Sequence, residues 1–446
     1  MRASRLLFLL VIPLVCLLSI GIYYLPPVHS RLAWRLDELV LRIKYTLNPP
    51  GEAVFIPQQA GTQVVETALP PIPSPTALRP TPTSAAQQTD DPSTPGVDSP
   101  TPMPTVVPTI TPTPLPERVE LQGVRYEDQH GRLNYCAPAN LSMALSYWDW
   151  QGNRDVVGPV LKPDQRDKNV MPAEMAWYVE NETDLKVVSR VGGDLDLLKR
   201  SIATGFPVLV EKGVYFRDLT GVVSWMGHYL VLTGYDEQEG VFIAQDSFVK
   251  PDNRIPFEDM LKGWRAFNYL YLIIFPAEKE TEVMALLGAE ADETVNFQNS
   301  ALRASNEVLG LTGIDQYFAY FNRGSSLVQL QDYAGAALVY DEAFKIYPTI
   351  PEAERPWRML WYQTGPYWAY FYSQRYYDTL YLADGTLNAM QSDKNLEESY
   401  YWRGMARAAL NDQAGAIEDF LTSLEFHPGF EPALYQLRLL GVEPPA

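Results

Sequence analysis

Residues 134–140 read Asn-Tyr-Cys-Ala-Pro-Ala-Asn, and this stretch decides how the rest of the sequence is interpreted. Apolar residues follow it at spacings of three and four, and Pro138 stands where the first turn of a helix tolerates a missing N–H. These features predict a helix that begins near Cys136. A thiol at a helix N-terminus lies at the positive end of the helix dipole, which favours the nucleophilic thiolate. Cys136 is therefore a candidate nucleophile, and the alternative is a small buried core residue.

The chain contains two cysteines, and Cys136 is the only one outside the N-terminal apolar segment. The other, Cys16, lies within that segment and is interpreted as a packing residue. Cys136 is therefore expected to be a free thiol, because it has no partner for an intramolecular disulfide.

A predicted β-hairpin carries the side chains that would activate this thiol. Residues 228–233 are rich in β-formers and bounded by glycines, residues 236–240 predict a turn, and residues 241–246 predict the returning strand. Folding this hairpin places Asp246 opposite His228, or one diagonal step away, within hydrogen-bonding reach of the imidazole. The second strand can thus orient a base carried by the first.

Only four histidines occur in the chain. His29 follows the apolar N-terminal run, His130 lies in the loop before Cys136, and His427 lies far downstream in a helical region. His228 alone stands at the start of a predicted strand beside a carboxylate. A cysteine at a helix start, a histidine on a strand and an aspartate on the paired strand are the components of an activated thiolate.

The motifs around these residues resemble the papain-like cysteine peptidases related to the bacteriocin-processing, double-glycine leader peptidases. The resemblance rests on Gln129, residues 134–139, residues 227–236 and residues 245–247, which occur in that family's order. It extends over residues 122–276.

The resemblance implies a role for each of four residues. Cys136 would be the nucleophile, His228 the general base and acid, Asp246 the residue that orients His228, and Gln129 an oxyanion-hole donor. It also implies hydrolysis of a peptide bond through a covalent acyl-enzyme.

Two positions differ from the pattern of that family. Ala137 follows the cysteine where glycine is common, and Gln129 stands seven residues before Cys136, one more than the pattern predicts. The loop must then bulge for the Gln129 amide to reach the oxyanion position. These differences leave open a catalytically inactive, peptidase-like binding or scaffold module. Acyl transfer to an amine is a third hypothesis.

The central region, residues 117–277, predicts an α+β domain of the papain-like kind, with an N-terminal helix and an antiparallel sheet. Further helices are expected at 171–179 and 194–202, and strands at 186–190, 207–211, 228–233, 241–244 and 269–275. Trp148, Trp150, Trp225 and Met226 flank the motifs and are interpreted as core residues.

Residues 1–30 predict a transmembrane signal-anchor. The apolar run 6–25 is long enough to span a bilayer, and Arg2 and Arg5 precede it. A cleaved signal peptide is the alternative, although Val28-His29-Ser30 is a poor cleavage site. The folded domains are accordingly expected to be extracytoplasmic, either on a single-pass membrane protein or, after cleavage, secreted.

Residues 31–116 predict a juxtamembrane segment and a disordered linker. Residues 48–116 hold 18 of the 37 prolines, interleaved with Thr, Ser, Ala and Gln. Such a stretch buries too little apolar surface to fold, and proline keeps it extended. We expect it to act as a spacer without catalytic residues.

Residues 281–446 predict an all-α domain. Eight positions recur 80 residues apart in a pattern that resembles the tetratricopeptide repeat, with a degenerate copy between them. The first copy is Tyr320, Gly324, Leu327, Tyr333, Ala336, Tyr340, Ala343 and Pro348; the second is Tyr400, Gly404, Arg407, Gln413, Ala416, Phe420, Ser423 and Pro428. Repeats of this kind present a face to a peptide or protein partner.

Charge and composition limit the other functions. The net charge of -19 argues against a nucleic-acid partner, because phosphate binding needs a basic face. The sequence shows neither a His/Cys cluster nor a glycine-rich phosphate loop, so no metal and no organic cofactor is expected. The expected partners are a peptide or protein substrate, a protein on the repeats, and the membrane.

Overall fold

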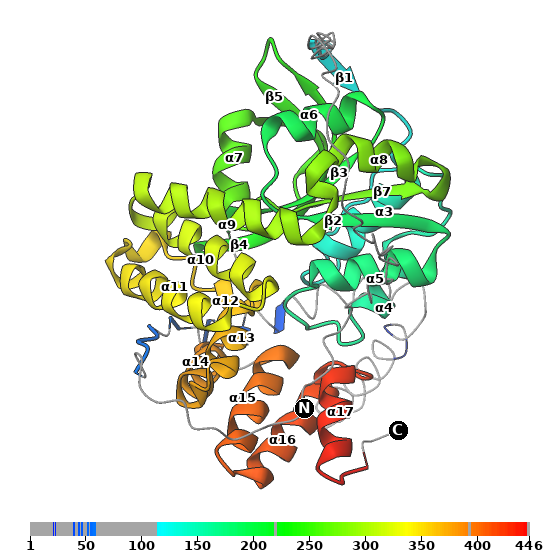
Figure 1. The fold of residues 1–446 in the computed structure, drawn as a ribbon. Helices are drawn as coiled ribbons and strands as arrows, with labels where there is room; N and C mark the ends of the chain where they lie inside the picture. The colour runs from blue at the N-terminus through cyan, green and yellow to red at the C-terminus, as the bar shows by residue number, and fades with distance from the viewer. Residues whose placement is uncertain are drawn as a thin grey trace, which may run out of the picture. The chain divides into compact units, whose positions relative to one another are not determined.

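The structure is a computed structural model that describes residues 114–217, 221–390 and 394–443, together with residues 51, 52, 54–58 and the isolated positions 21, 23, 39, 40, 43, 44, 46 and 47 (Figure 1). The chain divides into one unit of residues 1–62 and 115–446 and a second unit of residues 63–114. Most of the predicted linker and nearly all of the predicted anchor lie outside the described residues. Among the described helices, none is long and apolar enough to cross a membrane.

Within the described residues, seven strands form one antiparallel sheet. Its order is β2-β7-β3-β4-β5-β6, and β1 pairs with the end of β4. The strands are β1 (Arg118–Glu120), β2 (Leu185–Arg190), β3 (Val208–Arg217), β4 (Val223–Asp236), β5 (Val241–Asp246), β6 (Lys250–Pro256) and β7 (Tyr271–Pro276). The helices that accompany the sheet are α3 (Cys136–Ser146), α4 (Arg154–Leu161), α5 (Pro172–Glu182), α6 (Leu195–Ala203), α7 (Phe257–Arg265) and α8 (Glu280–Leu287).

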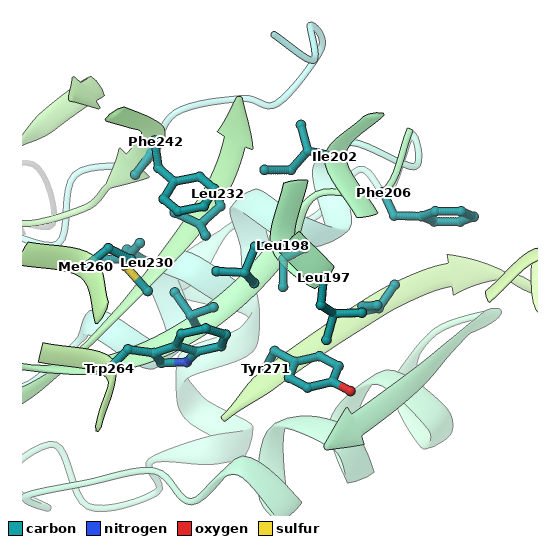
Figure 2. Packing of buried hydrophobic residues seen from close by; sticks show 14 of the residues in the cluster. Leu197, Leu198, Ile202, Phe206, Leu230, Leu232, Phe242, Met260, Trp264 and Tyr271 are labelled. Carbon is teal, nitrogen blue, oxygen red and sulfur yellow. The ribbon is translucent and has the colours of Figure 1, made fainter. Parts of the chain in front are cut away.

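One face of the sheet packs on α6, α7 and α8. Leu230 and Leu232 of β4 lie among apolar side chains from these helices, including Leu198 and Trp264 (Figure 2). Neighbouring residues of a strand point to opposite faces, so Tyr229 of β4 points away from this cluster. Tyr229 is only 1% exposed. The second face is therefore buried as well, and α3 packs against β3, β4 and β5.

The predicted elements around the site are confirmed, and their lengths differ. Cys136 is the first residue of α3, and β4 and β5 form the predicted hairpin. However, β4 begins at Val223, so the prediction that His228 stands at the start of a strand is wrong. The strand is longer because residues 213–217 of β3 continue the pairing with residues 223–227.

Four elements of the sheet domain were not predicted, namely β1, α4, β6 and α7. β6 reads Lys-Pro-Asp-Asn-Arg-Ile-Pro and lies at the edge of the sheet. Edge strands tolerate proline and polar residues, so this strand lacks the apolar alternation on which the sequence prediction depends.

The packing of the sheet domain continues beyond the predicted boundary at residue 277. Val283 and Leu287 of α8 belong to the same apolar cluster as the sheet. The helix therefore packs with the sheet domain, although the sequence analysis grouped it with the repeats.

The C-terminal region is all-helical in its described residues. It comprises α9 (Glu293–Gly310), α10 (Gly313–Gln329), α11 (Tyr333–Ile346), α12 (Met359–Tyr362), α13 (Gly365–Tyr372), α14 (Tyr376–Ala389), α15 (Glu397–Ala409), α16 (Gln413–Phe426) and α17 (Glu431–Leu439) (Figure 1).

The two predicted copies coincide with the helical hairpins α10–α11 and α15–α16. A Cβ on Gly324 would lie 2.6 Å from the ring of Tyr340, and a Cβ on Gly404 would lie 2.7 Å from the ring of Phe420. Both glycines thus let an aromatic ring of the second helix approach the first. Their assignment to the tetratricopeptide class stays a prediction.

Candidate active site

Cys136 lies at the N-terminus of α3, on a loop held by a buried lysine. Nζ of Lys162 donates hydrogen bonds to the carbonyl oxygens of Leu133 (2.8 Å) and Asn134 (3.0 Å). Lys162 is only 2% exposed, and Asn134 has a positive φ of 48°. The ammonium therefore fixes the turn into α3 and places a positive charge near the thiol. No pattern in the sequence singled out Lys162.

His228 and Asp246 form a buried pair. Nε2 of His228 lies 2.8 Å from Oδ1 of Asp246, and the side chains are 3% and 4% exposed. The register of the hairpin places Gln245 opposite Val231. Asp246 is therefore one diagonal step from His228, as the hairpin predicted.

The other bonds of Asp246 keep it ionised. Burial alone would raise the pKa of its carboxyl group, but the bond and charge of His228 and the N–H groups of Phe248 and Val249 lower that pKa below its usual value. These two N–H groups donate to Oδ1 over 3.0 and 3.1 Å. Asn253 donates to Oδ2 over 3.2 Å. A fixed carboxylate of this kind holds the imidazole ring in one orientation through its Nε2 atom.

The electrostatics favour a thiolate and an imidazolium. Burial by itself would raise the pKa of the Cys136 thiol, but a hydrogen bond with His228, the charge of His228, the N–H of Tyr229 and Lys162 outweigh it, and the pKa is lowered. Burial also disfavours the charged form of His228, yet its bonds with Asp246 and Cys136 raise its pKa to about 9. Both shifts favour the nucleophilic thiolate relative to an ordinary cysteine.

At Tyr229, β4 has no pairing with β5, and this explains how α3 and β4 are joined at the site. β5 ends at Asp246, so β5 does not pair with Tyr229. The Tyr229 N–H donates to Cys136, and its carbonyl oxygen accepts a 2.7 Å bond from Nδ2 of Asn140. The end of one strand thus leaves backbone groups free to anchor the start of α3.

A buried polar network connects α3 to the loop that carries Gln129. Nδ2 of Asn140 also lies 2.8 Å from the Cys136 carbonyl oxygen and 2.8 Å from Oγ of Ser247. Ser247 donates in turn to Oε1 of Gln129 over 2.7 Å. Asn140 and Ser247 belong to the quoted motifs, but the sequence analysis gave neither a role. Their full burial is the property that only the structure reveals.

Gln129 is held by both its backbone and its side chain. Its N–H donates to the carbonyl oxygen of Ser247 over 2.9 Å, and its Oε1 accepts from the Ser247 hydroxyl. The Nε2 amide has no hydrogen bond within the described part of the chain, and the residue is half-buried. The structure thus brings Gln129 to the same network as Cys136 despite the longer spacing.

His130, next to Gln129, takes no part in the pair with Asp246. Its Nδ1 lies 2.6 Å from Oδ1 of Asp128, and both side chains are more than half exposed. It remains a surface residue of the loop.

Two aromatic rings cover His228. Phe216 of β3 lies 5.4 Å from the imidazole, centroid to centroid, and Phe248 lies 6.2 Å from it. The two rings stack on each other at 4.3 Å. Both are half-buried, so they are candidates for substrate contact that the sequence analysis missed.

Two of the tryptophans that were interpreted as core residues are packed inside the sheet domain. Trp225 is 2% exposed and stacks on Phe267, and Trp148 packs against the sheet cluster and donates from Nε1 to the carbonyl oxygen of Ile274. These two positions agree with the core interpretation.

A buried carboxyl group lies near the reacting pair. Glu211 of β3 is 2% exposed, and its Oε1 has no hydrogen-bond partner. Burial raises its pKa well above the usual value, opposed by a hydrogen bond with Tyr229, and the negative charge of Cys136 raises it further. Burial and the charge of Cys136 thus favour the neutral form of the Glu211 carboxyl group.

The helical region contacts β4 beside the site. Arg358 donates to Oγ of Ser224 over 2.6 Å and to the carbonyl oxygen of Trp225 over 3.0 Å. Tyr362 of α12 packs edge-on against Trp225. A Cβ on Gly227, next to His228, would lie 3.0 Å from the Tyr362 ring, so this contact requires glycine.

One cluster of the described residues has side chains that could hold a metal ion. The ligand atoms of Glu174, Glu397 and His427 lie within 4.8 Å of one another. The Glu397 carboxylate already lies 3.0 Å from the imidazole Nδ1. A hydrogen bond between His427 and Glu397 therefore accounts for part of this arrangement. None of the three residues belongs to the Cys136 site.

A cysteine, a histidine and a carboxylate on an antiparallel sheet with a helix at the nucleophile define the papain-like cysteine peptidase class. The model of the Peptidase_C39 like family matches residues 121–272. Over these residues the chain is similar to C39-like peptidases, and the resemblance predicted from the sequence motifs is confirmed.

Among solved structures, the chain matches a protein from Bacillus anthracis described as a C39-like peptidase. The match has 17% identity and a TM-score of 0.30, and it covers 36% of this chain and 98% of the other. No match was found among the curated proteins. The family assignment of the sheet domain therefore depends on the family model.

Proposed function

We propose that this protein is a cysteine peptidase that hydrolyses peptide bonds with Cys136, His228 and Asp246. The observation that carries this proposal is the buried bond between His228 and Asp246, with the imidazole also bonded to a thiol at a helix start. A buried imidazolium that stabilises a thiolate is the condition for nucleophilic attack.

In the first half of the reaction, the Cys136 sulfur attacks the peptide carbonyl carbon. The developing oxyanion would accept hydrogen bonds from the Cys136 N–H and from Nε2 of Gln129. His228 then gives its proton to the leaving amine as the C–N bond breaks, and a thioester remains. Oε1 of Gln129 is already engaged by Ser247, which supports this orientation of its amide.

In the second half, water attacks the thioester. His228 takes a proton from the water, the carboxylic acid leaves, and the sulfur departs as a thiolate. Asp246 holds the imidazole in one orientation through both halves. The half-buried rings of Phe216 and Phe248 offer apolar contacts for a substrate side chain.

The test compares the full chain with Cys136→Ala on a diverse peptide library, with products read by mass spectrometry. We expect cleavage by the wild type and none by the variant. Iodoacetamide should label wild-type Cys136 faster than a free thiol near pH 7. Equal cleavage by both proteins, or silence from both with an ordinary labelling rate, would contradict the proposal.

We further propose that the apolar run 6–25 anchors the chain in a membrane with the folded domains outside the cytoplasm. Its length and the preceding Arg2 and Arg5 support this topology. Protease added to intact cells should digest the folded domains while leaving a cytoplasmic marker intact. Digestion only after lysis would contradict it.

A further inference from the structure

A short segment near the start of the proline-rich region 48–116 lies on the C-terminal helices. Its described residues are 51, 52 and 54–58, and the helices that they contact lie far downstream in the sequence. The Gly51 N–H donates to the carbonyl oxygen of Ala389 over 2.8 Å. At the other end, the Gln58 N–H donates to Oδ1 of Asp378 over 2.7 Å. Both ends of the segment are thus fixed through its backbone.

The acidic side chain of the segment has a dedicated partner. Nη1 of Arg355 lies 3.0 and 3.1 Å from the two carboxylate oxygens of Glu52. The side chains are 18% and 19% exposed. Tyr347 also hydrogen-bonds Glu52, and its pKa is raised by burial first and by this carboxylate second. A partly desolvated, charge-assisted contact of this kind discriminates against a neutral side chain.

The aromatic side chain of the segment fills an aromatic site. Phe55 meets Phe344 of α11 edge-to-face, with centroids 4.9 Å apart, and lies 5.9 Å from Tyr370 of α13. The neighbours Val54 and Ile56 are 44% and 70% exposed. The specific contacts of the segment are therefore made by Glu52 and Phe55, which are three positions apart.

The surface beneath the segment is a groove with unfilled space. It encloses a cavity of about 320 Å³, and its walls include Tyr317, Trp357, Trp361 and Leu382. These walls come from α10, α12, α14 and the loop before α12. The groove thus has room for a bulkier side chain than the chain's own segment provides.

We propose that this groove is a peptide-binding site, and that its ligand is the chain's own segment, residues 51–58, bound in cis and able to detach. The site selects an extended peptide with an acidic residue three positions before an aromatic one. Arg355 and Tyr347 bind the acidic side chain, and Phe344 and Tyr370 pack against the aromatic ring.

Docking of residues 51–58 in the groove determines whether the linker forms a closed loop or a spacer. Residue 58 and residue 115 belong to the same folded unit, so the linker between them starts and ends on that unit. An intramolecular ligand on such a linker has an effective concentration on the order of 1 mM, so weak contacts suffice to hold it. The linker therefore closes a loop when the segment is docked and becomes a spacer only when the segment leaves.

Hydrogen exchange on the full chain tests the docking, in a Cys136→Ala background that removes proteolysis. We expect the amides of Gly51 and Gln58 to exchange at least tenfold more slowly than unstructured amides. Glu52→Ala combined with Phe55→Ala should remove that protection. Leu309→Ala is the control, because it removes an apolar side chain that is 86% exposed and lies outside the groove. Unprotected amides before any substitution would overturn the proposal.

A labelled peptide with the sequence of residues 50–59 tests the site in trans. It should bind the Glu52→Ala, Phe55→Ala variant, whose groove is open, with a Kd of about 0.1 mM or lower. With a cis ligand at about 1 mM effective concentration, it should bind the protein with the intact segment about tenfold more weakly. A peptide with alanine in place of its Glu and Phe should not bind the opened variant. Equal affinity for both proteins, or no saturation of the opened variant by about 5 mM peptide, would overturn the proposal. Unchanged circular dichroism would verify folding.

Discussion

Within the described part of the chain, a buried and a partly buried histidine–carboxylate pair differ in what surrounds them. His228 lies 2.8 Å from Asp246, and His427 lies 3.0 Å from Glu397. The first pair also bonds a thiol, and backbone N–H groups lower the pKa of its carboxyl group. At the second pair, burial and the nearby Asp167 and Glu174 raise the pKa of Glu397 well above its usual value.

The difference shows that proximity of a histidine to a carboxylate does not define a catalytic pair. Asp246 is ionised because donors meet its oxygens, so it can stabilise an imidazolium. Glu397 faces other carboxyl groups, and its Oε2 has no hydrogen-bond partner. Only the first pair also includes a thiol at a helix start, which is the arrangement that the proposed reaction needs.

The largest effect should come from removing the imidazole of the first pair, with the imidazole of the second pair as the comparison. His228→Ala should lower kcat/KM by roughly a thousandfold or more, because the general acid and the partner of the thiolate are both lost. His427→Ala should leave kcat/KM within a few fold. Steady-state kinetics on a substrate identified from the library checks this. A comparable loss in both variants would mean that the second pair also serves catalysis.

The site of the first pair includes an amide donor, Gln129, and the second pair has no counterpart of it. Removal of this amide should have the next largest effect. Gln129→Ala should lower kcat by about a hundredfold while KM changes little, since an oxyanion donor acts in the transition state. Gln122→Ala, in the same stretch of chain and bonded to Glu120 on the surface, is the control. A loss expressed only in KM would assign Gln129 to substrate binding instead.

Asp246→Asn should have a smaller effect on rate and a clear effect on pH dependence. Loss of the carboxylate should lower kcat by roughly tenfold, because an amide can still orient the imidazole. Wild-type activity should fall as the pH rises through about 9, where His228 loses its proton. In the variant this limb should move to lower pH. Glu397→Gln should leave the limb in place, and a shift there would contradict the distinction between the pairs.

The smallest effect concerns stability near the second pair. Burial, followed by the charge of Glu398, raises the pKa of Glu174 to about 8. A carboxyl group whose pKa is raised on folding stabilises the fold below its unfolded pKa of about 4.5. That contribution is lost as the pH rises towards 8. Since the Glu174 side chain is 28% exposed, we expect this group to lower the free energy of unfolding by only about 1 to 2 kcal/mol between pH 5 and pH 8.

Glu174→Gln should remove this pH dependence and stabilise the protein at pH 8. Urea unfolding of both proteins at pH 5 and pH 8 measures the difference in the free energy of unfolding. The matched control is Glu182→Gln, an exposed glutamate at the end of the same helix. An unchanged difference between the two pH values in Glu174→Gln would show that Glu174 is ionised in the folded state.

The site was predictable from sequence where local rules apply. Pro138 and the apolar spacing placed Cys136 at a helix start, and the turn before Val241 set the hairpin that joins His228 to Asp246. Both are short-range patterns, so no knowledge of the rest of the fold was needed. The start of β4 was missed because its length depends on the partner strand β3.

Contacts between distant segments lay beyond the sequence. Lys162 reaches the loop before Cys136, Ser247 reaches Gln129, and Glu52 reaches Arg355 across 303 positions. Each residue is of an ordinary type in an ordinary position, and nothing in its neighbourhood marks it. The charge and burial that give it a role arise only when the chain folds.

The sequence by itself indicated the candidate nucleophile and its candidate base, the family that the sheet domain resembles and the helical nature of the C-terminal region. These features follow from periodicity, turn chemistry and motif order, which are properties of neighbouring residues. The tertiary structure decided the ionisation of the pair, the orientation of Gln129 and the occupant of the groove. These depend on burial and on contacts across hundreds of residues, because solvent exclusion and charge proximity are properties of the fold.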